Sequence, residues 1–143
     1  MELSVLLLIL IPVVTAFLIP LIDIIYKKMR KVIVVISISG ELLLTLLFII
    51  YKYNSFINGN LSLKYYLGGW SSVLGITLQM DNIAFLFSSL ISLSMFLIIL
   101  YSIGFIGHHE GKYYVLIFLL LGSMQGAVLT GDIFNLYVFI ELM

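Results

Sequence analysis

Cysteine is absent from the 143-residue sequence, and charged residues are scarce. Without cysteine, disulfides, iron–sulfur ligation and thiol catalysis are excluded, although the compartment is not revealed. Only 10% of the residues are charged, and seven basic residues balance seven acidic ones, so net charge does not predict a nucleic-acid partner. The sequence contains no nucleotide-binding loop, nucleophile elbow or redox-cofactor motif. We therefore expect neither a cofactor nor chemical catalysis.

Long apolar runs dominate what remains, because 63% of the residues are hydrophobic. This composition excludes a soluble globular domain and is typical of integral membrane proteins. The runs predict an all-α integral membrane fold with about five transmembrane helices, the last one incomplete, in a single domain over residues 1–143. The predicted helices cover about residues 3–22, 32–51, 82–105, 113–129 and 133–143.

A polar linker joins the second and third predicted helices, between about residues 53 and 80. Residues 61–66 and 73–78 have the pattern of two short strands around a glycine-rich turn. The linker therefore predicts a short β-hairpin on the membrane surface.

Lysine and arginine set the expected orientation, because loops rich in these residues stay in the cytoplasm. Five basic residues follow the first and third predicted helices, against two on the other side: Lys27, Lys28, Arg30, Lys31 and Lys112 against Lys52 and Lys64. We expect a multi-pass protein of the cell membrane with its N-terminus outside and an extracytoplasmic hairpin.

Glu141 is the most informative single residue. It lies nine residues after Asp132, which places it about 13 Å into a hydrocarbon layer of about 30 Å. An ionisable group at this depth costs several kcal/mol unless it has a partner, so it is a candidate for proton transfer. A structural hydrogen bond to a neighbouring helix is the alternative. Tyr137, four residues earlier on the same face, could bond the carboxylate.

The last helix has eleven residues, about 16 Å, which is half of a membrane crossing. Its final carbonyl groups and Glu141 would then lie unpaired in hydrocarbon, at several kcal/mol each. We expect a longer polypeptide, or another chain that supplies the missing helices.

The run GSMQGAVLTGDIFNLYVFIE at residues 122–141 resembles the start of the core of antiporter-like subunits. It is most like the D-type subunit of Mrp-type multisubunit cation/proton antiporters, which are related to complex I-like enzymes and membrane-bound hydrogenases. Leu67-Gly68-Gly69-Trp70, Gly75-Ile76 and Asp81 also match the family's hairpin and the entry to its third helix.

The resemblance implies a polypeptide of about fourteen helices built from inverted repeats. It also implies that Glu141 occupies the position of a glutamate that transfers protons and pairs with a lysine on a later helix. That lysine lies outside these 143 residues. The implied partners are the lipid bilayer, other subunits of the complex, the chain carrying the remaining helices, H⁺ and Na⁺.

Two further polar residues are candidates for a relay or a polar lining. Glu41 lies near the middle of the second predicted helix and is either a second relay site or a helix-packing contact. Gln125 lies in a GxxxG pattern that admits a close neighbour, so it either packs between helices or extends a hydrated path. Interhelical bonding is also expected of Ser88, Ser89, Ser92 and Ser94.

Asp81 and Asp132 are expected to cap the helices that follow them. His108 and His109 are adjacent, which is poor geometry for a metal, and we predict no metal site.

The sequence therefore predicts part of a proton- or cation-translocating membrane subunit, similar to Na⁺/H⁺ antiporters, within a multisubunit complex. The alternatives are a proton-pumping module of a complex I-like NADH dehydrogenase or membrane-bound hydrogenase, and a truncated scaffold that does not transport.

Overall fold

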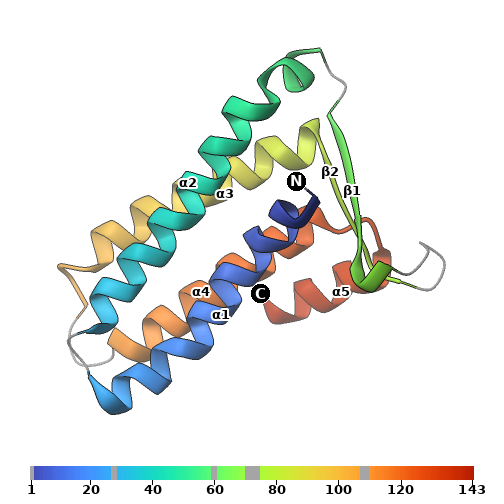
Figure 1. Ribbon diagram of the computed structural model, residues 1–143. Helices are drawn as coiled ribbons and strands as arrows, with labels where there is room; N and C mark the ends of the chain where they lie inside the picture. Colours follow the sequence, from blue (N-terminus) through green and yellow to red (C-terminus); the bar gives the residue numbers. More distant parts are fainter. Residues whose placement is uncertain (1, 27–28, 59–60, 70–74, 107–109) are drawn as a thin grey trace.

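The computed structural model describes residues 2–26, 29–58, 61–69, 75–106 and 110–143. Within them the chain forms five α-helices and one antiparallel strand pair (Figure 1). The elements are α1 (Glu2–Ile25), α2 (Met29–Ile57), β1 (Ser62–Tyr66), the short 3-10 turn η1 (Leu67–Gly69), β2 (Thr77–Asp81), α3 (Asn82–Ser102), α4 (Glu110–Leu129) and α5 (Ile133–Leu142). The predicted all-α membrane fold with a hairpin is confirmed.

The ends of several helices differ from the prediction. α1 continues to Ile25 rather than residue 22. α2 begins three residues earlier and ends six residues later than expected, because no proline or glycine interrupts the chain between residues 51 and 57. α3 ends at Ser102 rather than residue 105, where Gly104 disfavours a further helical turn. α4 begins at Glu110 rather than residue 113, so this glutamate belongs to a helix and not to the preceding loop.

The second strand of the hairpin lies later than predicted. β2 starts at Thr77 and continues to Asp81, whereas residues 75 and 76 are not in a strand and residues 73 and 74 lie outside the described residues. The reason is the alternation of burial: Leu78 and Met80 are 2% and 1% exposed and point into the core, while their neighbours are half-buried. In the ladder, Leu63 pairs with Met80 and Tyr65 with Leu78.

The four long helices pack as an antiparallel ring in which α1 and α3 each contact both α2 and α4 (Figure 1). Among the described helices, α4 is the one on which α5 packs extensively. The hairpin lies across one end of the ring, where Leu78 and Met80 join Val5 and Leu8 in one apolar cluster. A second cluster around Tyr114 and Phe118 fills the other half.

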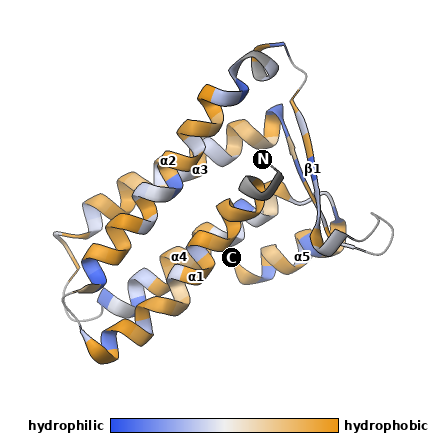
Figure 2. Cartoon of the chain, viewed as in Figure 1, coloured by the Kyte–Doolittle hydropathy of each residue, from blue (hydrophilic) through white to orange (hydrophobic). Residues whose placement is uncertain are grey.

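The outward faces of the helices are apolar. Four helices are long and apolar enough to cross a membrane, over residues 5–25, 29–53, 82–102 and 110–129, and α5 is a shorter apolar helix. Hydrophobic residues cover most of the helical surface, and hydrophilic ones gather near the helix ends and the hairpin (Figure 2). A surface of this kind suits lipid or other membrane helices, and the chain is a multi-pass membrane protein.

An ion-pair cluster joins three helices at the end opposite the hairpin. Arg30 donates to Asp23 of α1 at 2.7 Å and to Glu110 of α4 at 2.6 Å, and Lys31 lies 3.2 Å from Glu110. Close packing supports the cluster, because a side chain at Gly111 would overlap the Asp23 carboxylate. The sequence did not predict this cluster. Because successive spanning helices place alternate loops on the same side of the membrane, the sequence could have placed these residues at one end of the bundle.

We expect Arg30→Met to destabilise the protein by about 2–3 kcal/mol, because two carboxylates lose a charged hydrogen-bond donor while the aliphatic stem is retained. Unfolding of the full-length protein in mixed micelles of denaturing and mild detergent measures this change. Lys112→Ala is the control, since Lys112 is exposed on the same end of the bundle. Equal stability of the two variants would contradict a structural role for the cluster.

Candidate functional site

The turn before α5 is tied to the hairpin. The backbone N–H of Gly131 donates to the Thr77 carbonyl at 2.8 Å, and Thr130 forms an isolated bridge with Leu78. A side chain on Gly131 would come within 3.3 Å of the Thr77 carbonyl, so this close approach favours glycine. The start of α5 is therefore held against the end of the bundle that carries β2.

Polar side chains cap the helices on both sides of this junction. Asp132 accepts from the N–H of Phe134 at 3.2 Å, and the Asn135 amide donates to the Thr130 hydroxyl at 3.0 Å. Asp81 caps α3 by accepting from the N–H of Ala84 at 2.7 Å. These bonds satisfy donors that a helix start leaves free.

Two glycines of α4 bring different helices close. Gly122 faces Val13 of α1, and a side chain at Gly126 would overlap the ring of Phe139 in α5. The GxxxG pattern thus serves two neighbours rather than one. Since α4 and α5 run antiparallel and Phe139 lies beside Gly126, Glu141 lies about level with Met124.

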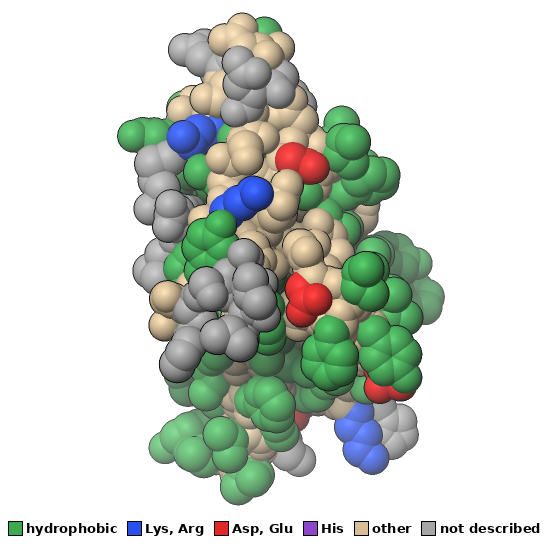
Figure 3. Space-filling view, turned by 90° about the vertical axis from the view of Figure 1, so that its right-hand side faces the viewer, with side chains coloured by type: hydrophobic (Ala, Val, Ile, Leu, Met, Phe, Trp, Pro, Cys, Tyr) green, Lys and Arg blue, Asp and Glu red, His purple; other side chains and the backbone are tan. Residues whose placement is uncertain are grey.

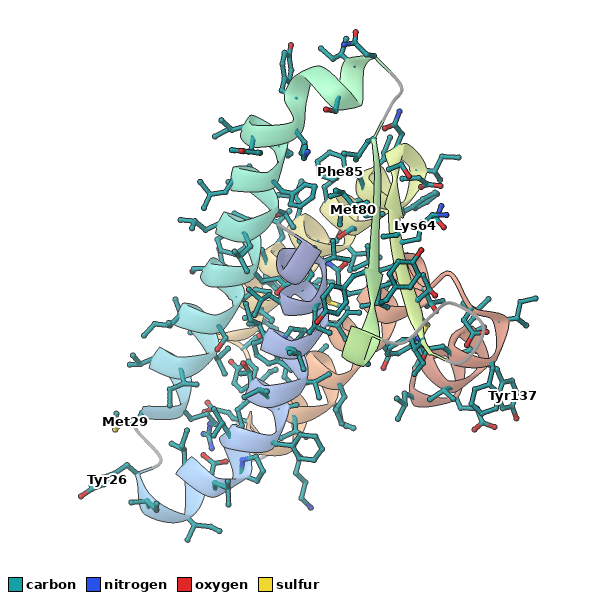
Figure 4. All side chains as sticks on the ribbon, turned by 45° about the vertical axis from the view of Figure 1, so that its right-hand side comes forward. Tyr26, Met29, Lys64, Met80, Phe85 and Tyr137 are labelled. Atoms are coloured by element: carbon teal, nitrogen blue, oxygen red, sulfur yellow. The ribbon has the colours of Figure 1, made fainter. Side chains whose placement is uncertain are left out.

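Glu141 lies at the surface of the described bundle, near the end of α5. The Tyr137 hydroxyl donates to its carboxylate at 2.5 Å, and the described part of the chain gives it no ion-pair partner. Tyr137 is itself 58% exposed and projects away from the bundle (Figure 4). Large exposed side chains surround this pair along α5: Ile133, Phe134, Val138, Ile140 and Leu142.

Gln125 lies at the centre of a buried hydrogen-bond cluster between α3 and α4. Its side chain is fully buried, accepts from the Ser88 hydroxyl at 2.7 Å, and donates to the Ser92 hydroxyl at 2.9 Å. It also donates to the Ser88 carbonyl at 3.2 Å. Of the four serines considered from the sequence, Ser89 bonds within its own helix and Ser94 is exposed.

Glu41 is buried in α2 and differs from Gln125 in having no partner. Its side chain is 1% exposed, and neither carboxylate oxygen has a hydrogen-bond partner among the described residues. A buried carboxylate without a donor is costly when ionised. Among the described residues, no hydrogen bond joins Glu41 to Glu141.

The two histidines considered as metal ligands, His108 and His109, lie outside the described residues. Across the described ranges, no group of three or more histidine, cysteine, aspartate or glutamate side chains could hold a metal ion.

Comparison with known proteins finds relatives over almost the whole chain, although no model of a protein family matches it. The chain is 31% identical to the D-type subunit of the Na⁺/H⁺ antiporter of Alkalihalophilus pseudofirmus over 141 residues, which is 95% of this chain and 28% of that protein. It is 40% identical to the D-type subunit of the Na⁺/H⁺ antiporter of Bacillus subtilis over 79 residues, which is 54% of this chain and 16% of that protein. It is 30% identical to the A1-type subunit of the Na⁺/H⁺ antiporter of Staphylococcus aureus over 138 residues, which is 94% of this chain and 17% of that protein.

A solved structure agrees in fold and sequence. One chain of the membrane-bound sulfane sulfur reductase, described as an archaeal respiratory membrane complex, matches with a TM-score of 0.88 and 31% identity. The match covers 99% of this chain and 28% of that one.

The chain is related to antiporter-type membrane subunits. This confirms the resemblance found at residues 122–141, and extends it to α1 and α2, where the sequence motifs alone gave little. The chain spans between about one sixth and just over a quarter of the length of these relatives.

We expect Gln125→Leu to lower stability by about 1–2 kcal/mol, because two serine hydroxyls lose their interhelical partner. Unfolding of the full-length protein in mixed micelles measures the loss. Ser89→Ala is the matched control, because that hydroxyl bonds only the Leu86 carbonyl of its own helix. A stability loss no greater than that of the control would show that the cluster does not hold α3 against α4.

Proposed function

We propose that this chain is the N-terminal part of a proton- or cation-translocating subunit that works within a multisubunit complex of the cell membrane. The observation that carries the proposal is Glu141, a carboxylate on an apolar helix whose one bond in the described structure comes from Tyr137. The relationship to Na⁺/H⁺ antiporter subunits supports the same role.

Glu141 is proposed to exchange protons by alternating between a charged and a neutral form. When ionised, it accepts the Tyr137 hydrogen bond, which compensates part of the cost of a charge next to hydrocarbon. A bound proton removes that charge. The single described donor of Glu141 contrasts with Glu110, which is held in ion pairs with Arg30 and Lys31.

The proposal needs a covering partner for α5. Its exposed apolar side chains and the exposed Glu141 suit burial against further membrane helices, supplied by the same polypeptide or by another chain. A basic group on such a helix would complete an ion pair with Glu141 and make its proton affinity depend on the position of that group. H⁺ is the proposed transported ion, with Na⁺ as the exchanged cation.

The proposed orientation places the Arg30 cluster in the cytoplasm and the hairpin outside. α1 and α3 end, and α2 and α4 begin, at the same end of the bundle, and five of the seven basic residues lie near these helix ends in the sequence. The N-terminus of α1 then faces outward, and α5 enters the membrane from the outer side.

A second candidate is a proton-pumping module under an oxidoreductase. The match to a chain of a respiratory membrane complex favours it, because its identity of 31% equals that to the antiporter protein of Alkalihalophilus pseudofirmus. In both candidates this chain moves ions and does not transfer electrons. A truncated scaffold without transport is the remaining alternative.

We expect Glu141→Gln to abolish cation-dependent proton exchange in vesicles that contain the assembled full-length complex, while assembly is retained. Glutamine preserves the shape and the Tyr137 contact but cannot release a proton. Asp132→Asn is the matched control, because asparagine caps a helix as well as aspartate does and the same carboxylate-to-amide change lies at the other end of α5.

Undiminished exchange by the Glu141→Gln complex would defeat the assignment and favour a scaffold. Exchange driven by an imposed cation gradient alone identifies an antiporter, whereas transport that needs a reductant identifies the redox-driven module.

A further inference from the structure

Glu41 is a buried acid in the described structure that the proposed role of Glu141 does not explain, and both of its carboxylate oxygens lack a hydrogen-bond partner there. It is 1% exposed, and α2 packs on both α1 and α3, so the side chain lies within the ring of helices. Helix packing alone would be served as well by leucine, without the cost of a buried polar group that has no partner.

Contacts along α1 place Glu41 at the level of the buried Gln125. Gly122 of α4 faces Val13 of α1. Two residues further along α1, the hydroxyl oxygen of Thr15 lies 2.9 Å from that of Ser37 in α2. Both helix pairs are antiparallel, so these contacts put Gln125 level with the residue that follows Glu41. The offset between them is about 1.5 Å along the bundle.

Contacts along α3 give the same level independently. The rings of Phe48 and Phe85 are 5.8 Å apart, which fixes the register of α2 against α3. Gln125 bonds two serines of α3 that lie one turn apart. This route puts Gln125 level with the second residue after Glu41, about 3 Å along the axis. Both polar groups therefore lie in one layer of the helix ring.

A hollow of about 380 Å³ opens at the hairpin end, directly beyond this layer. Its lining includes Gln79, Asp81, Ala84, Val128 and Thr130. Figure 3 looks onto the side that carries the hairpin, where charged side chains lie among uncharged polar groups and backbone, with hydrophobic side chains along the flanks.

The lining of the hollow ends about one helical turn from the Gln125 cluster. Ser88 lies one turn beyond Ala84 on α3, and Gln125 lies one turn before Val128 on α4. Polar groups thus continue from the hairpin end to the level of Glu41.

We propose that Glu41 is a second proton-binding carboxylate, reached from the hairpin side through this hollow and the Ser88–Gln125–Ser92 cluster. The inference deepens the proposed function, since it rests on the chain being part of a proton-translocating protein. A proton passes along the serine hydroxyls and the water that this cluster binds, and Glu41 holds it as the neutral acid.

No charged group on the described parts of the packed helices competes for Glu41. The acidic and phenolic residues of α1 and α3 are Glu2, Asp23 and Tyr101, each at least nine residues, or about 13 Å, from its level. On α4, Tyr114 lies about ten residues, or about 15 Å, away by the same register. The basic residues of α2 itself lie near its ends.

Infrared spectroscopy of the reconstituted full-length complex tests the proposal without relying on transport. The spectrum of the wild type minus that of Glu41→Gln should contain the carbonyl band of a protonated carboxyl group at neutral pH. In D₂O, this band should shift as the proton exchanges. Exchange should be about tenfold slower in Gln125→Leu and Ser88→Ala, which corresponds to about 1.4 kcal/mol on a rate barrier. Ser89→Ala, which faces away from the cluster, should exchange at the wild-type rate.

Carboxylate bands in place of the protonated band would overturn the site, because Glu41 would then be ionised and paired. Equal exchange rates in Gln125→Leu and Ser89→Ala would overturn the path. The Glu141→Gln complex separates the two proposals: if it transports normally but keeps the Glu41 band, the role of Glu141 fails and that of Glu41 stands.

Discussion

The low polarity of the bundle is the constraint on which the structure depends. In such surroundings each buried polar group must find a partner inside the protein or remain uncharged. Gln125 meets this requirement completely, since its oxygen and its nitrogen both bond to α3. Because these bonds are directional, they fix the register of α3 against α4, which apolar side chains alone specify weakly.

The hairpin positions the start of α5. β2 contributes two buried side chains to the core and ends in the residue that caps α3. Its first residue accepts the hydrogen bond from Gly131, just before α5. One short strand therefore positions the starts of two helices. The place of Glu141 is then fixed by two contacts: this junction at one end of α5 and the packing of Phe139 on Gly126 along its length.

The sequence predicted the elements that depend on local pattern. Long apolar runs identified the helices, and the Asp81 and Asp132 caps follow from residue type and position. The likeness at residues 122–141 identified the relatives. Strand β2 was misplaced because the prediction followed the apolar run at residues 73–78, whereas the strict alternation lies at residues 77–81, where Leu78 and Met80 are buried in the core.

Tertiary properties could not be read from the chain. The ion pairs of Arg30 join residues from three helices, and nothing local distinguishes this arginine from its basic neighbours. Likewise, the depth of Glu41 in its helix was evident, but its lack of a partner among the described residues depends on what α1 and α3 place opposite it. Such negative facts arise from packing, so a sequence pattern does not contain them.

The two carboxylates occupy different surroundings at a similar level of the bundle. Glu141 lies level with Met124, and Gln125, the next residue of α4, lies at about the level of Glu41. They belong to helices on opposite sides of α4, so two helix spacings, or about 20 Å, separate them. At an effective dielectric constant of about 20, two charges at that distance interact by about 0.8 kcal/mol. This is small beside the several kcal/mol that a charge costs in hydrocarbon. The two carboxylates are therefore almost independent electrostatically, and their surroundings differ: Tyr137 is the described partner of Glu141, whereas Glu41 is buried without one.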